Sequence, residues 1–100
     1  MKQVKFTKNQ RDEISQQVQI RIDSVDYPSL SGGTLHEFEK SEADMVGLEN
    51  ALDRNTRNGF SEMEISYMIL LVEDAREHLD WEDCSGGIRS LGNALKKMEA

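Results

Sequence analysis

The chain has 100 residues, a length that suits one compact domain and is too short for two. Its 19 acidic residues outnumber the 12 basic ones, and the net charge of −7 argues against a protein that binds nucleic-acid backbones directly. The single cysteine, Cys84, excludes an intramolecular disulfide, and one cysteine with two separated histidines offers no zinc-binding pair.

The start of the chain indicates a cytoplasmic protein. Residues 1–10 lack the apolar run of a signal peptide, and the longest apolar run, residues 68–72, is far shorter than the ~20 residues that span a bilayer. Residues 1–11 hold basic side chains and no acidic one, so residues 1–6 are expected to form a basic arm before a single helical domain. The arm either packs on the protein's own body, a second copy or a partner, or lies exposed in solvent.

The first helix is expected from residue 8 to about Asp26. Thr7 and Gln10 form the polar pair of a capping box, and Phe6 precedes them as a hydrophobic staple. Pro28, the only proline, ends the helix. Between these signals, apolar residues recur at helical spacing at Ile14, Val18, Ile22 and Val25.

The second helix is expected after residues 31–33 and carries a narrow apolar stripe on an otherwise charged surface. The stripe consists of Leu35, Phe38, Met45, Leu48 and Leu52. A stripe this narrow is typical of a coiled-coil seam, so we predict that it packs against a second copy and forms a homodimer. Residues 54–59 then form a turn by composition.

A second capping box, Ser61 with Glu64, starts the third helix. This helix holds the most continuous apolar stretch of the chain, so it is expected to be buried on several sides. Residues 85–87 are expected to end it, and a fourth helix follows with apolar residues at helical spacing. No stretch shows sustained strand alternation. The sequence therefore predicts an all-α fold, either a small four-helix bundle or two helical hairpins.

One loop sequence occurs twice. Residues 26–33 and 80–87 both contain aspartate, an aromatic residue, three variable residues and Ser-Gly-Gly, at an offset of 54 residues. The repetition favours a duplicated helical hairpin, with repeats at residues 8–54 and 61–99. The aromatic and Ser-Gly-Gly residues are Tyr27, Ser31, Gly32 and Gly33 in the first copy and Trp81, Ser85, Gly86 and Gly87 in the second.

Two interpretations of these loops stay open. A glycine pair at a helix start lets backbone N–H groups approach an anion, and a nearby aromatic ring stacks on a base, which together describe a nucleotide site. Arg54 and Arg57, in the turn between helices, add two guanidinium groups suited to a phosphate. In the other interpretation, the glycines only end one helix, the serines cap the next, and the arginines are solvated.

Acidic pairs three residues apart suggest a metal site at first sight. Glu39 with Glu42, and Glu77 with Asp80, resemble in spacing the Mg²⁺-binding motif of all-α nucleotide pyrophosphatases of the MazG type. The apolar residues interleaved with that motif are missing, and a chain with 19 acidic residues produces such spacings freely. A solvated acidic face, with no metal, no cofactor and no catalytic residue, is therefore expected.

In its size, negative charge, capped helices and lack of a catalytic set, the chain resembles the small accessory proteins of bacteriophages, including anti-CRISPR and other anti-defence inhibitors. This resemblance implies stoichiometric inhibition of a host protein, without catalysis, in the host cytoplasm. A protein that sequesters a nucleotide or cyclic nucleotide is the alternative, and a Mg²⁺-dependent nucleotide pyrophosphatase is the third hypothesis. The acidic side chains expected to meet a basic surface of the host protein are Glu37, Glu39, Glu42, Asp44, Glu49 and Asp53.

Overall fold

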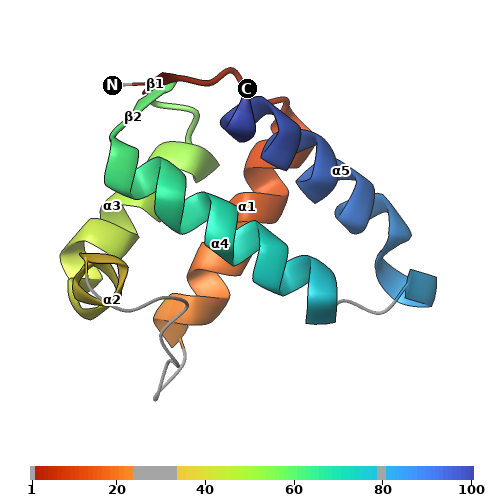
Figure 1. Ribbon diagram of the computed structural model, residues 1–100, viewed down its shortest axis with the longest axis horizontal. Helices are drawn as coiled ribbons and strands as arrows, with labels where there is room; N and C mark the ends of the chain where they lie inside the picture. Colours follow the sequence, from red (N-terminus) through yellow and green to blue (C-terminus); the bar gives the residue numbers. More distant parts are fainter. Residues whose placement is uncertain (1, 24–33, 79–80) are drawn as a thin grey trace.

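The computed structural model describes residues 2–23, 34–78 and 81–100, with the backbone alone at residues 34, 78 and 81–88. These ranges hold five helices and one two-stranded antiparallel sheet (Figure 1). The prediction of an all-α fold is thereby confirmed. In chain order the elements are β1 (Lys2–Gln3), α1 (Lys8–Asp23), α2 (Thr34–Lys40), α3 (Glu42–Asp53), β2 (Gly59–Phe60), α4 (Glu62–His78) and α5 (Trp81–Glu99).

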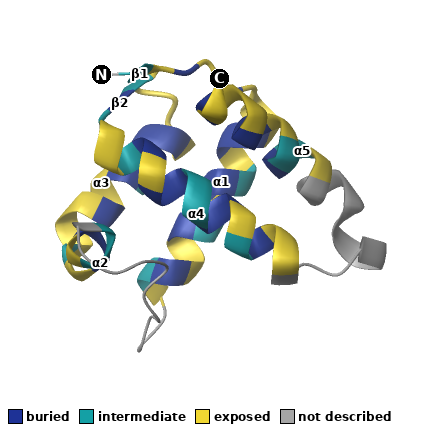
Figure 2. Cartoon of the chain, in the orientation of Figure 1, coloured by how far each residue is buried: buried dark blue, intermediate teal, exposed yellow. Residues whose placement is uncertain are grey.

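Helix α1 lies at the centre of the molecule and packs against α3, α4 and α5 (Figure 1). Helix α2 packs against both α3 and α4. Figure 2 shows the buried residues on the faces that these helices turn toward one another. The side chains with no exposed surface include Ile14, Val18, Met45, Leu48, Leu52, Met68, Val72 and Leu91. Each such side chain stabilises the fold by about 1.5–3 kcal/mol relative to an exposed one.

Both predicted capping boxes are present. At the start of α1, the Thr7 N–H donates to Gln10 Oε1 at 2.8 Å, and the Gln10 N–H donates to Thr7 Oγ1 at 3.2 Å. At the start of α4, the Ser61 N–H donates to Glu64 Oε1 at 2.9 Å, and the Glu64 N–H donates to Ser61 Oγ at 3.1 Å. These bonds satisfy N–H groups that a helix start otherwise leaves without partners.

The basic arm packs on the protein's own body. Its Lys2 and Gln3 pair with β2, and the Val4 N–H continues the ladder by donating to the Asn58 carbonyl at 2.9 Å. Val4 and Phe6 are buried, and the Phe6 ring lies 5.9 Å from that of Phe60 between centroids. An exposed arm is therefore the wrong alternative. The arm packs through backbone hydrogen bonds and apolar contacts, which its basic composition does not predict.

The second expected helix is two helices. Ser41 leaves the helical conformation, with φ −86° and ψ 86°, and so separates α2 from α3. The break lets each helix pack on a different neighbour: Phe38 of α2 meets Tyr67 of α4 with ring centroids 4.7 Å apart, while α3 lies along α1.

Four of the five residues of the stripe predicted as a dimer seam are buried in the protein's own core, and the fifth, Leu35, is half-buried against it. Phe38 is 4% exposed, and Met45, Leu48 and Leu52 are fully buried. The prediction that this stripe packs against a second copy is therefore wrong, because α1 packs against α3 and α4 packs against α2. A dimer formed through another surface stays a prediction.

Helix α4 ends earlier than expected, and α5 begins at Trp81. Residues 85–87 consequently lie inside α5 and do not separate two helices. Glycine in a helix interior costs only about 1 kcal/mol relative to alanine, so packing of the following residues, Leu91 and Met98 among them, outweighs it.

Candidate functional site

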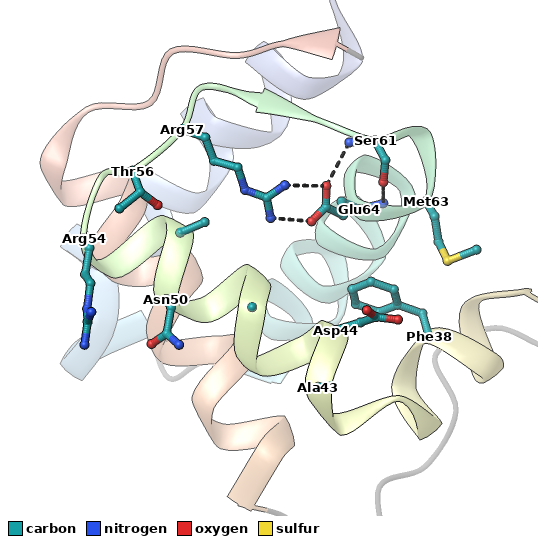
Figure 3. A pocket seen from close by; sticks show the side chains of 12 residues that line it. Phe38, Ala43, Asp44, Asn50, Arg54, Thr56, Arg57, Ser61, Met63 and Glu64 are labelled. Atoms are coloured by element: carbon teal, nitrogen blue, oxygen red, sulfur yellow. Dashed lines mark hydrogen bonds and ion pairs between the residues drawn. The ribbon is translucent and has the colours of Figure 1, made fainter.

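A cavity of about 560 Å³ opens between α3 and the segment that leads into α4 (Figure 3). Its floor is one face of α3, formed by Ala43, Gly47 and Ala51 at intervals of four residues. A Cβ atom placed on Gly47 would meet no heavy atom within 4 Å. The small residues therefore leave the backbone of α3 bare at the bottom of an open groove, hereafter the α3 groove.

One side of the α3 groove is formed by the ion pair between Arg57 and Glu64. Arg57 Nη1 and Nη2 donate to Glu64 Oε1 and Oε2 at 3.2 and 2.6 Å, as the dashed lines in Figure 3 show. The guanidinium also lies 5.4 Å from the centroid of the Phe60 ring. Because Glu64 neutralises Arg57 and both are fixed in position, this pair shapes the groove and supplies no free charge.

The remaining lining is mixed in character. Asp44 and Asn50 are exposed polar residues of α3, and Arg54 follows at its end. Met63, 38% exposed, projects from the start of α4, and Phe38 closes the groove at α2 (Figure 3). The groove therefore offers both apolar surface and hydrogen-bonding groups, the combination found in binding sites.

Of the two arginines predicted to bind a phosphate, Arg54 and Arg57, only Arg54 is free of an ion pair among the described residues. Both residues line the α3 groove, but Arg57 is committed to Glu64. Within the described ranges Arg54 forms no ion pair, and its side chain is exposed.

Four of the six predicted partner-binding acids are exposed: Glu37, Glu42, Asp44 and Asp53. Glu49 is half-buried and accepts a hydrogen bond from the Ser15 hydroxyl at 3.2 Å. Glu39 is 1% exposed and pairs with Arg21 of α1, so its assignment to an exposed acidic face is wrong. Arg21 lies three residues beyond Val18 on the apolar side of α1, and a cation in that position was the signal for a buried acid.

The repeated loops yield no site in this structure. Tyr27, Ser31, Gly32 and Gly33 lie outside the described residues, and for Trp81, Ser85, Gly86 and Gly87 only the helical backbone is described. Because residues 85–87 lie inside α5, the expected loop with a glycine pair at a helix start is wrong for the second copy. The nucleotide interpretation of the first copy stays a prediction.

The acidic pairs do not form a metal site where the structure describes them. Glu39 points into the core toward Arg21 while Glu42 is exposed, and Asp80 is outside the described residues. In the described part of the chain, no three His, Cys, Asp or Glu side chains gather closely enough to hold a metal ion. None of the helices there combines the length and the apolar character needed to cross a membrane.

Comparison with known proteins finds no matching family model, no similar curated protein and no similar solved structure. The function is therefore inferred from the residues themselves.

Proposed function

We propose that this is a non-enzymatic binding protein that uses the α3 groove to dock on a basic surface of a partner protein. In this proposal it acts by stoichiometric occupation of that surface, as a phage-type inhibitor of a host protein would. The observation that carries the proposal is Gly47, an exposed glycine in the middle of a helix with nothing above it.

Neither the backbone nor packing explains Gly47. It lies inside a regular helix, and a Cβ there would enter open space. Alanine at such a position is more favourable than glycine by about 0.5–1 kcal/mol. A side chain at residue 47 would, however, fill the floor of the groove, so the glycine is accounted for by close approach of a partner to the backbone of α3.

The charge around the α3 groove indicates the chemistry of that partner. Glu42 and Asp44 occupy the first turn of α3, and Glu62 occupies the first turn of α4. All three are exposed, and Asp44 lines the groove itself. They outnumber the exposed cation of the lining, Arg54, because Arg57 is already paired with Glu64. Such a surface attracts a positively charged one and disfavours nucleic-acid backbones.

Exposed apolar side chains add the contact area that charge alone does not supply. Val46, next to Gly47, is 36% exposed, and Met63 is 38% exposed across the groove. Partly apolar surface surrounded by charged residues is a common composition of protein–protein interfaces, where methionine is enriched.

The test compares four baits in capture from a host-cell extract: the parent chain, Gly47→Leu, Asp44→Lys and the control Glu73→Lys. Leucine at residue 47 projects into the open groove, since its Cβ meets no heavy atom within 4 Å, and Glu73 is an exposed acid elsewhere, on α4. We expect one partner to be retained by the parent and Glu73→Lys and lost by the two groove variants, with circular dichroism showing equal folding.

The captured partner is then purified and titrated by calorimetry. A 1:1 complex whose affinity falls as salt is raised agrees with the proposal, because exposed charges are screened within about 8–10 Å at such ionic strength. Capture of the same protein by all four baits, or of none by the parent, would contradict it.

A further inference from the structure

A second cavity, of about 320 Å³, lies between the start of α1 and the end of α3. Lys8 and Arg11 line it from α1, and Arg54 lines it from the turn after α3. Asp12 and Asp53 complete its charged lining. Three cations from two separate elements thus surround one small space, hereafter the Arg11 cavity.

Arg11 is an unusual residue to find there, because it is only 4% exposed. Its Nη2 donates to the Asn58 side-chain oxygen at 2.6 Å and to the Arg57 carbonyl at 3.2 Å. Its Nη1 is buried and has no hydrogen-bond partner. No acidic side chain of the described residues forms an ion pair with it.

Burial of a guanidinium group without a counter-charge is energetically unfavourable. Loss of hydration lowers the pKa of Arg11 from its ordinary value. The other buried arginine, Arg21, has the carboxylate of Glu39 beside it. Arg11 therefore lacks the counter-charge that a buried cation ordinarily requires, while it borders a space in which one would fit.

The two other cations of the cavity are well placed to share an anion. Lys8 and Arg54 are exposed, and no ion pair within the protein engages them among the described residues. Asn55 adopts a left-handed conformation, with φ 54°, and the Arg54 N–H bonds back to the Asn50 carbonyl, so the turn that carries Arg54 is well defined. The start of α1 adds the positive end of its dipole.

We propose that the Arg11 cavity binds the phosphate group of a small phosphate monoester. The phosphate receives hydrogen bonds from the Arg11 guanidinium, Lys8 and Arg54, a set of donors that matches a tetrahedral dianion. A cavity of about 320 Å³ is larger than phosphate alone requires, and the exposed Asp12 and Asp53 carboxylates accept hydrogen bonds from hydroxyl groups of the attached organic part. This site is separate from the proposed α3 groove, with which it shares only Arg54.

The experiment is a calorimetric and NMR titration of the whole chain with ribose 5-phosphate, inorganic phosphate, acetate and ribose. We expect ribose 5-phosphate to bind most tightly, inorganic phosphate more weakly, and acetate and ribose not measurably. Amide signals of Lys8 and Asn55 should shift during the titration, whereas those of α5 should not.

Variants assign the binding to the cavity. Lys8→Gln removes an exposed charge without touching the core, and loss of one charged hydrogen bond weakens binding about tenfold. Lys40→Gln, an equally exposed lysine on α2, is the matched control and should bind like the parent. Arg11→Met should abolish binding. If Arg11→Met does not fold, the affinity of Lys8→Gln for ribose 5-phosphate alone tests the proposal.

Three results would overturn the proposal: no phosphate-dependent shift at Lys8 or Asn55, equal affinity of Lys8→Gln and the parent, or tighter binding of acetate than of phosphate. None of these results bears on the α3 groove, because neither Lys8 nor Arg11 lines it.

Discussion

Replacement of Glu39 by alanine should lower the free energy of unfolding by about 3–5 kcal/mol. Glu39 is 1% exposed and Arg21 is 8% exposed, and their side chains form an ion pair that joins α1 to α2. The substitution leaves the Arg21 guanidinium buried without its carboxylate, which is the costly way to break such a pair. A domain of this size is stable by about 5–15 kcal/mol, so the loss is a large part of the total.

The assay is urea unfolding followed by circular dichroism, with Glu37→Ala as the matched control. Glu37 lies on the same short helix and is exposed, so its removal should change stability by no more than about 0.5 kcal/mol. Glu39→Gln keeps an oxygen able to accept from Arg21 and removes only the charge, so its effect should fall between the two. If Glu39→Ala and Glu37→Ala unfold at the same urea concentration, the buried pair does not stabilise the fold and the reasoning fails.

Two further predictions concern a glycine within α3 and the residue that caps α4. Gly47→Ala should stabilise the protein by about 0.5–1 kcal/mol, because its Cβ enters open space, and thermal unfolding should shift up by a few degrees; a fall in the midpoint would show that the space is not free. Ser61→Ala removes the oxygen that accepts the Glu64 N–H and should cost about 0.5–2 kcal/mol by the same assay, whereas no loss would mean that the capping box is redundant.

Features that depend on neighbours in the chain could be predicted from the sequence. The capping boxes are contacts between residues three apart, so Ser61 and Glu64 in the printed sequence were enough to place the start of α4. The same holds for the apolar spacing that places Ile14 and Val18 in the core.

Features that depend on tertiary packing could not be predicted in this way. The break at Ser41 has no proline or glycine to announce it, and its Oγ makes no capping bond. The break allows Phe38 to contact Tyr67 of α4 while Leu48 packs in the core. These contacts depend on how the helices pack in space. Likewise, the burial of Glu39 depends on Arg21, 18 residues away.

The capping boxes extend the evidence for duplication. Thr7 and Ser61 are separated by 54 residues, the offset at which the two Ser-Gly-Gly sequences match. At this offset Val18 corresponds to Val72, and both are fully buried. One constant offset from the capping box to the Ser-Gly-Gly sequence favours the interpretation of residues 7–33 and 61–87 as a single repeated unit.

The same offset singles out the two buried arginines of α1. Arg11 corresponds to Ile65 and Arg21 to Ala75, so α4 carries buried apolar residues where α1 carries guanidinium groups. An apolar side chain is stabilising in such a place, whereas a cation there needs a counter-charge, so each arginine calls for its own explanation. Arg21 finds a counter-charge in Glu39. Arg11 finds none among the described residues, and this contrast between the two buried arginines is the physical ground for the proposal that a bound anion supplies its counter-charge.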